Sequence, residues 1–329
     1  MSTTSRILAS LTALALLAAC DPGSHALPSA PGNGITAMMF STEGTPWSAP
    51  VNLGATINSA ANEQNATLSP DGLALYFTSS RADGAGPLDI WVAHRECTDL
   101  ADAACAWQTP GNLGSVINTP GADFAPNLSL DGHLLFFASN RGVGTNIDIY
   151  VSHRGDPNDD FVWETPVALG PGVNTVDGDQ APMYRQSAED GAANLYFNRG
   201  LLASNSADIY VAAVTRDGET SGRAELVTEL SLPNVNDAAV TVRTDGRELM
   251  FYSNRPGGLG LTDLWVSTRS NSHEPWSPPV NAGASLNSPF ADVTPSISAD
   301  GRTLIFASNR PGGFGGNDLY MATRTPSGN

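Results

Sequence analysis

The chain contains 329 residues, of which 41% are hydrophobic and 15% charged, so it can bury a sizeable core and its composition argues against wholesale disorder. Its 33 acidic residues outnumber 16 basic ones, and the net charge of -17 argues against nucleic-acid binding. All 16 basic residues are arginines, and the lack of lysine excludes Schiff-base chemistry and a Walker A phosphate loop.

The N-terminal segment is typical of an export signal. Arg6 precedes an apolar run that is too short for a permanent membrane helix but suits a signal peptide over residues 1–19. The tetrapeptide LAAC, ending at Cys20, resembles the lipobox of bacterial lipoproteins; the alternative is an ordinary signal peptide that ends in cysteine. Residues 20–34, rich in Pro, Gly and Ser, predict a flexible tether. The resemblance implies a lipidated Cys20 and a cell-envelope location, on the periplasmic face or the cell surface, with membrane contact through the anchor alone.

Two further cysteines, Cys97 and Cys105, lie close together in the sequence ECTDLADAAC. Export would place them in an oxidising compartment, where they are expected to form a disulfide. The alternatives are two free thiols, or a metal pair without its other ligands.

Internal repeats predict the fold. Segments resembling ATLSPDGLALYFTSSRADGAGPLDIWVAHR (66–95) recur four more times, one of them degraded, at intervals of 60, 59, 55 and 55 residues between the turn aspartates Asp71, Asp131, Asp190, Asp245 and Asp300. Short alternating strands without helical periodicity indicate a β-propeller rather than a helical solenoid.

Each repeat predicts four antiparallel strands, the fourth opened by tryptophan, as in Trp107–Pro110. The last repeat lacks this strand, but Trp47–Gly54 precedes the first one and can complete it. Residues 35–329 are therefore expected to form an all-β, five-bladed β-propeller of four-stranded antiparallel blades, closed by the N-terminal strand completing the last blade.

The repeats resemble the TolB-like, Pro-Asp variant of the WD-type propeller repeat. The resemblance rests on Ser69-Pro70-Asp71-Gly72, on the loop Ser308–Gly313 and on Asp318-Leu319-Tyr320. It covers nearly all of the predicted mature chain and implies a propeller, in a family that includes binding scaffolds and enzyme-attached propellers and whose motifs are poor indicators of function.

One acidic residue per repeat precedes the turn aspartate, by eight positions in four repeats and by eleven in the third. These residues are Glu63, Asp123, Asp179, Asp237 and Asp292. Because they enter the innermost strands, they are expected to ring one mouth of the central channel as a Ca²⁺ site or a polar ligand cradle. The alternative is that each pairs with an arginine of the next loop, namely Arg81, Arg141, Arg199, Arg255 or Arg310. No other cofactor is expected.

The third repeat departs from the pattern. A three-residue insertion brings in Tyr184 and Arg185, which are expected at the same channel mouth as the carboxylates, and the sequence Asp177-Gly178-Asp179 adds a carboxylate, so a specific ligand site is expected here first. The acidic group Asp156, Asp159 and Asp160 is expected to be a solvated loop on the opposite face.

These observations predict a lipid-anchored propeller that binds or scaffolds an envelope protein, a peptide or a glycan. The alternative is a carbohydrate-active hydrolase or lyase that uses carboxylates at the channel mouth. Glycoside hydrolysis would require two carboxylates about 5 to 9 Å apart, one with a raised pKa.

Overall fold

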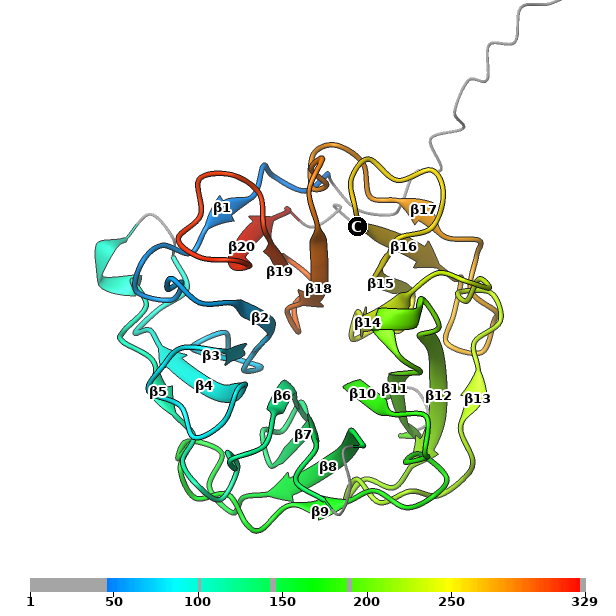
Figure 1. Ribbon diagram of the computed structural model, residues 1–329, viewed down its shortest axis with the longest axis horizontal. Coiled ribbons are helices and arrows are strands. Elements are labelled where there is room, and N and C mark those ends of the chain that lie inside the picture. The colour runs from blue at the N-terminus through cyan, green and yellow to red at the C-terminus, as the bar shows by residue number, and fades with distance from the viewer. Residues whose placement is uncertain (1–45, 100–101, 143–145, 188–190, 326–329) are drawn as a thin grey trace, which may run out of the picture. The chain divides into compact units, whose positions relative to one another are not determined.

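The computed structural model describes residues 46–99, 102–142, 146–187 and 191–325. Five four-stranded antiparallel sheets surround a central channel (Figure 1). The predicted five-bladed propeller is therefore confirmed. The predicted signal peptide, Cys20 and the tether lie outside the described residues, and no described helix is long and apolar enough to cross a membrane.

Each blade runs from the channel outward. The innermost strands are β2 (Glu63–Leu68), β6 (Asp123–Leu128), β10 (Asp179–Gln186), β14 (Asp237–Val242) and β18 (Asp292–Ile297). The second strands are β3 (Ala74–Ser79), β7 (Leu134–Ser139), β11 (Ala193–Arg199), β15 (Glu248–Ser253) and β19 (Thr303–Ser308). The third strands are β4 (Asp89–His94), β8 (Asp148–His153), β12 (Asp208–Val214), β16 (Asp263–Thr268) and β20 (Asp318–Thr323).

The outermost strands have only two residues each: β5 (Gly111–Asn112), β9 (Val167–Ala168), β13 (Glu225–Leu226), β17 (Val280–Asn281) and β1 (Val51–Asn52). All except β13, which has no tryptophan before it, begin four residues after the tryptophans that were expected to open them. The tryptophans instead pack beneath arginine side chains, such as Trp107 beneath Arg95 at 4.5 Å. β1 pairs with β20, with Asn52 opposite Tyr320, so the predicted closure by the N-terminal strand is confirmed.

The core lies between neighbouring blades. Along β3, Leu75 and Phe77 pack in a cluster with Ile305 of the fifth blade, whereas Tyr76 packs with Leu135 of the second. Successive side chains of a strand point to opposite faces, which is why an almost wholly apolar second strand can serve two interfaces.

Each innermost strand bends at its third residue. Asn65, Ala125, Ala181, Ala239 and Thr294 have φ between 49° and 55°. In all five blades the pairing with the second strand shifts register around this residue, as in a β-bulge. The described residues also form two 3-10 helices, η1 (Ala103–Cys105) and η2 (Leu202–Ser204). The disulfide between Cys97 and Cys105 is present beside η1, as predicted.

Candidate functional site

The five repeated carboxylates begin the innermost strands, and all are fully buried. Each forms an ion pair with an arginine at or just after the end of the second strand of its own blade, for example Asp123 with Arg141 and Asp237 with Arg255, both at 2.6 Å. The remaining pairs are Glu63–Arg81, Asp179–Arg199 and Asp292–Arg310. This is the geometry of the alternative in which every carboxylate has an arginine partner.

The same arginines also connect other parts of each blade. Arg255, for example, donates to the carbonyl of Leu230 and lies over the rings of Phe251 and Trp265 at 4.8 and 5.3 Å. Because the carboxylate, the carbonyl and the rings surround the guanidinium, its charge is compensated within the blade. The ion pairs therefore stabilise the blades whether or not the face above them binds a ligand.

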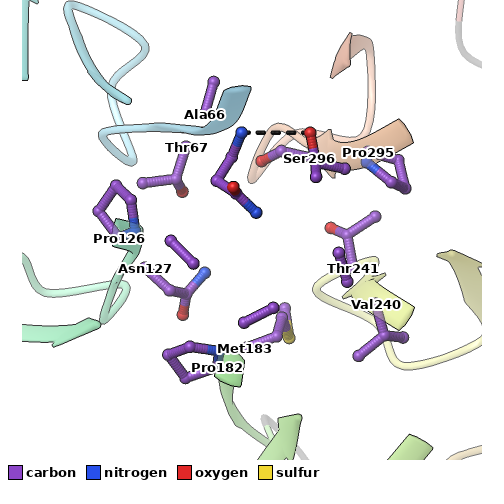
Figure 2. Close-up of a pocket in the computed structure, with 15 residues that line it drawn as sticks. Ala66, Thr67, Pro126, Asn127, Pro182, Met183, Val240, Thr241, Pro295 and Ser296 are labelled. Carbon is purple, nitrogen blue, oxygen red and sulfur yellow. Dashed lines mark hydrogen bonds between the residues drawn. The ribbon is translucent and has the colours of Figure 1, made fainter. Parts of the chain in front are cut away.

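The channel holds a cavity of about 40 Å³ between the innermost strands (Figure 2). Asn65, Asn127, Thr241 and Ser296 line it together with alanine and proline side chains, and none of the described residues around it is a carboxylate. This volume holds one or two waters and is far below the roughly 300 Å³ of a small-molecule site. A sugar could therefore bind only at a face of the propeller.

Tyr184 and Arg185 lie at the other end of the channel from the carboxylates, which corrects their predicted place at the same mouth. β10 begins at Asp179 and ends at Gln186, so both residues belong to its far end. Tyr184 is buried and stacks on Phe136 with 5.0 Å between ring centroids. Arg185 is buried as well.

A second set of repeated aspartates begins the third strands, on the same face as the carboxylate–arginine pairs. In three blades the aspartate accepts two loop amides and the side-chain amide of an asparagine; Asp318, for instance, accepts from Phe314 N at 2.6 Å and from Asn52 at 3.0 Å. Asp89 and Asp263 have the same arrangement, with Asn112 and Asn281 as donors.

Asp148 and Asp208 break this pattern. The positions of the donor asparagines are taken by Ala168 in the second blade and Leu226 in the third, and no hydrogen bond reaches either carboxylate from the described residues. Burial, followed by the negative charge of Asp179, raises the pKa of Asp148. Burial and the charge of Asp237 do the same for the pKa of Asp208. Sequence reasoning missed this pair, although the change from asparagine to alanine or leucine in the fourth strands is visible in the repeats.

A further carboxylate lies near Asp148 in the neighbouring blade. Asn146 donates to the carbonyl of Thr175 at 2.5 Å, which holds the loop before Asp148 against the loop that carries exposed Asp177. Asp179, two residues later, accepts a hydrogen bond of 2.6 Å from Thr175 N, and burial raises its pKa despite the Arg199 guanidinium. The charge of Asp179 therefore acts on Asp148 across the junction of the second and third blades, and exposed Asp177 lies in the loop that leads to Asp179.

Comparisons with known proteins give structural matches alone. No protein-family model matches the chain, and no curated protein matches its sequence. An α-L-arabinofuranosidase from Lactobacillus brevis superposes with a TM-score of 0.56 at 11% identity, covering 82% of this chain and 92% of the other. An arabinanase of Bacillus subtilis has a TM-score of 0.54 at 14% identity, with coverage of 82% and 96%. A family 62 glycoside hydrolase solved with xylotriose has a TM-score of 0.53 at 12% identity, with coverage of 86% and 98%.

At such identities the likeness shows the fold alone, but it corrects two predictions. The similar structures named above are glycoside hydrolases and no family model matches the chain, so the assignment to the TolB-like, WD-type family was wrong. The principal prediction of a binding or scaffolding module is overturned with it, and the comparisons favour the alternative of a carbohydrate-active hydrolase. They give no support to the predicted signal peptide or lipoprotein.

Proposed function

We propose that the protein is a carbohydrate-active hydrolase in which Asp148 is the general acid. The observation that carries this proposal is the environment of Asp148: it is half-buried, Ala168 stands where its counterparts have an asparagine donor, and burial together with Asp179 raises its pKa. A carboxyl group with a raised pKa keeps its proton closer to neutral pH, which is what protonation of a glycosidic oxygen requires.

The second carboxylate in this mechanism is Asp177. Its exposed side chain is available to remove a proton from the attacking water while Asp148 protonates the leaving oxygen. Asp179 is a positioning residue, since it is buried, paired with Arg199 and acts on Asp148 through its charge. Asp208 has no counterpart of Asp177. The equivalent loop of the fourth blade, residues 232–236, carries no carboxylate.

The substrates to test first are arabinan and arabinose-substituted xylo-oligosaccharides, since the structural neighbours are named as an arabinofuranosidase and an arabinanase, and one was solved with xylotriose. The purified full chain should release arabinose or shorter oligosaccharides, measured by chromatography. Asp148→Asn and Asp177→Asn should each lower kcat by at least about 100-fold, the contribution typical of general acid–base catalysis.

Matched controls are Asp208→Asn, at the equivalent strand position of the third blade, and Asp83→Asn, exposed in the loop of the first blade. Both should retain wild-type kcat and KM. Lack of turnover on the whole panel, or equal losses in Asp208→Asn and Asp148→Asn, would overturn the proposal.

A further inference from the structure

A second repeated arginine lies on the face of the propeller opposite the carboxylate–arginine pairs. Directly after the third strand, Arg95, Arg154, Arg269 and Arg324 each donate from Nε to the carbonyl of the turn glycine of their own blade, at 2.6 to 2.8 Å. Each guanidinium lies 4.0 to 4.5 Å from a tryptophan ring centroid, namely Trp107, Trp163, Trp276 and Trp47. The position of the guanidinium is thus fixed by the repeat.

The charge of this arginine is compensated differently from blade to blade. Arg154 pairs with Asp160 of its own blade at 2.6 Å. Arg324 pairs at 2.8 Å with Glu248, the first residue of β15 in the preceding blade. For Arg95 the preceding blade is the fifth, where Thr303 begins β19 in place of a glutamate.

Arg95 has no anionic partner of this kind in the described part of the chain. It is 6% exposed, and its buried Nη1 has no hydrogen-bond acceptor among the described residues. Desolvation by burial lowers the pKa of this guanidinium, against the opposing effect of Asp71. An unpaired buried donor of a charged group is unfavourable, so an anion supplied from outside would be stabilised here.

A cavity of about 380 Å³ lies beside Arg95, between the first and fifth blades. Its lining combines the arginines Arg95, Arg302 and Arg324 with the carboxylates of Asp71 and Asp300 and the apolar side chain of Met321. The volume falls within the range of small-molecule sites. The cavity therefore offers cations, hydrogen-bond acceptors and an apolar wall to one ligand.

We propose that this cavity binds an acidic sugar, a uronic acid residue, through its carboxylate. The carboxylate pairs with the terminal nitrogens of Arg95, and the sugar hydroxyls donate to Asp71 and Asp300. In both aspartates the hydrogen bonds from the turn go to Oδ1, and no described residue donates a hydrogen bond to Oδ2, although Arg302 Nε lies 4.0 Å from Oδ2 of Asp300. Two carboxylates in the lining would repel a phosphate dianion but suit a monoanion rich in hydroxyl groups.

The test is a titration of the full chain with galacturonic acid and digalacturonate, followed by calorimetry, with galactose as the neutral control and inorganic phosphate as the anion control. The acidic sugars should bind at least tenfold more tightly than galactose or phosphate, and the affinity should fall with salt. Equal binding of galactose, or tighter binding of phosphate, would overturn the proposal.

Thr303→Glu is the decisive variant, because it places a carboxylate where Glu248 stands in the fourth blade and so gives Arg95 an internal partner. It should weaken uronate binding at least tenfold without lowering the melting temperature. Arg302→Gln, at an exposed position, should weaken binding less, and unchanged affinity in Thr303→Glu would overturn the assignment. The readout is binding alone, so it is independent of whether Asp148 catalyses hydrolysis.

Discussion

Arg154 donates a hydrogen bond of 2.6 Å from Nη1 to Oδ1 of Asp160, and both side chains are almost fully buried. Asp160 also accepts the hydroxyl of Tyr76 from the first blade and lies 2.7 Å from Nε2 of His94. The expected solvated loop is therefore wrong for this residue, whereas its neighbours Asp156 and Asp159 are exposed. Asp160 connects the first two blades because its carboxylate interacts with donors from both.

Replacing Asp160 tests this role. Asp160→Asn should lower the free energy of unfolding by about 3–5 kcal/mol, because it leaves a buried guanidinium without its counter-charge. Asp159→Asn, in the same loop but exposed, should change it by less than about 0.5 kcal/mol. Urea unfolding of both variants measures the difference, and similar values would show that Asp160 is not part of the interface.

The carboxylate–arginine pair of Asp237 and Arg255 is the most buried of the five, with side chains 0% and 6% exposed. Asp237→Asn should cost about 3–5 kcal/mol of unfolding free energy. Combining it with Arg255→Met should restore part of that loss, since the double variant buries no unpaired charge. A double-mutant cycle by chemical denaturation measures this coupling, and strict additivity would contradict the ion-pair interpretation.

Sequence repeats were sufficient to predict the blades, their number and their closure, because each blade repeats one pattern and Trp47 supplies the missing segment. They also predicted, as one of two alternatives, that each repeated carboxylate pairs with an arginine of the next loop. They did not place Tyr184 and Arg185 correctly, although Tyr184 is the sixth residue of its strand, as Ile297 is of β18, and so belongs to the end of the strand away from the carboxylate. The partners of Asp160 come from a separate repeat, Tyr76 and His94, so they depend on how neighbouring blades pack.

Asp148 was missed for a different reason. An aspartate stands at this position in every blade, so Asp148 itself is not unusual. The difference lies in the fourth strand, where Ala168 replaces the asparagine that donates to the equivalent aspartate. A search for unusual acidic residues finds Asp177 and passes over Asp148. The feature that distinguishes Asp148 is the lack of an asparagine donor. It can be recognised only once the structure shows that Asn52, Asn112 and Asn281 donate to the equivalent aspartates.

Restoring the missing donor should lower the pKa of Asp148. In Ala168→Asn the new amide can donate to the carboxylate as Asn112 does to Asp89 at 3.0 Å, which favours the charged form. If Asp148 is the general acid, the alkaline limb of the kcat–pH profile should move to lower pH and activity at neutral pH should fall. Leu226→Asn, the matching change beside Asp208, should leave the profile unchanged; a shift in this control would contradict the assignment.

The raised pKa of Asp148 also predicts how stability depends on pH. A carboxyl group whose pKa is higher in the folded than in the unfolded protein binds its proton more tightly when folded, so its charge destabilises the fold above the raised pKa. This destabilisation is lost as the pH falls from that pKa towards the unfolded value. Asp148→Asn should therefore raise the melting temperature at pH 7 and lose this advantage near pH 4. A lower melting temperature at pH 7 would show that the charge is compensated in the fold.

The junction that closes the propeller depends on a glycine. A Cβ on Gly315 of the fifth blade would lie 2.0 Å from the carbonyl oxygen of Ala61 in the first, and Gly260 meets the carbonyl of Phe290 at 2.1 Å in the same way. Gly315→Ala must therefore push the two loops apart and should destabilise the protein by about 1–3 kcal/mol. Gly155→Ala is the control, since a Cβ there meets nothing within 4 Å. Because Phe314 and Gly315 also donate to Asp318, the loss should be accompanied by faster amide hydrogen exchange in this loop, and protection unchanged from wild type would contradict the tight junction.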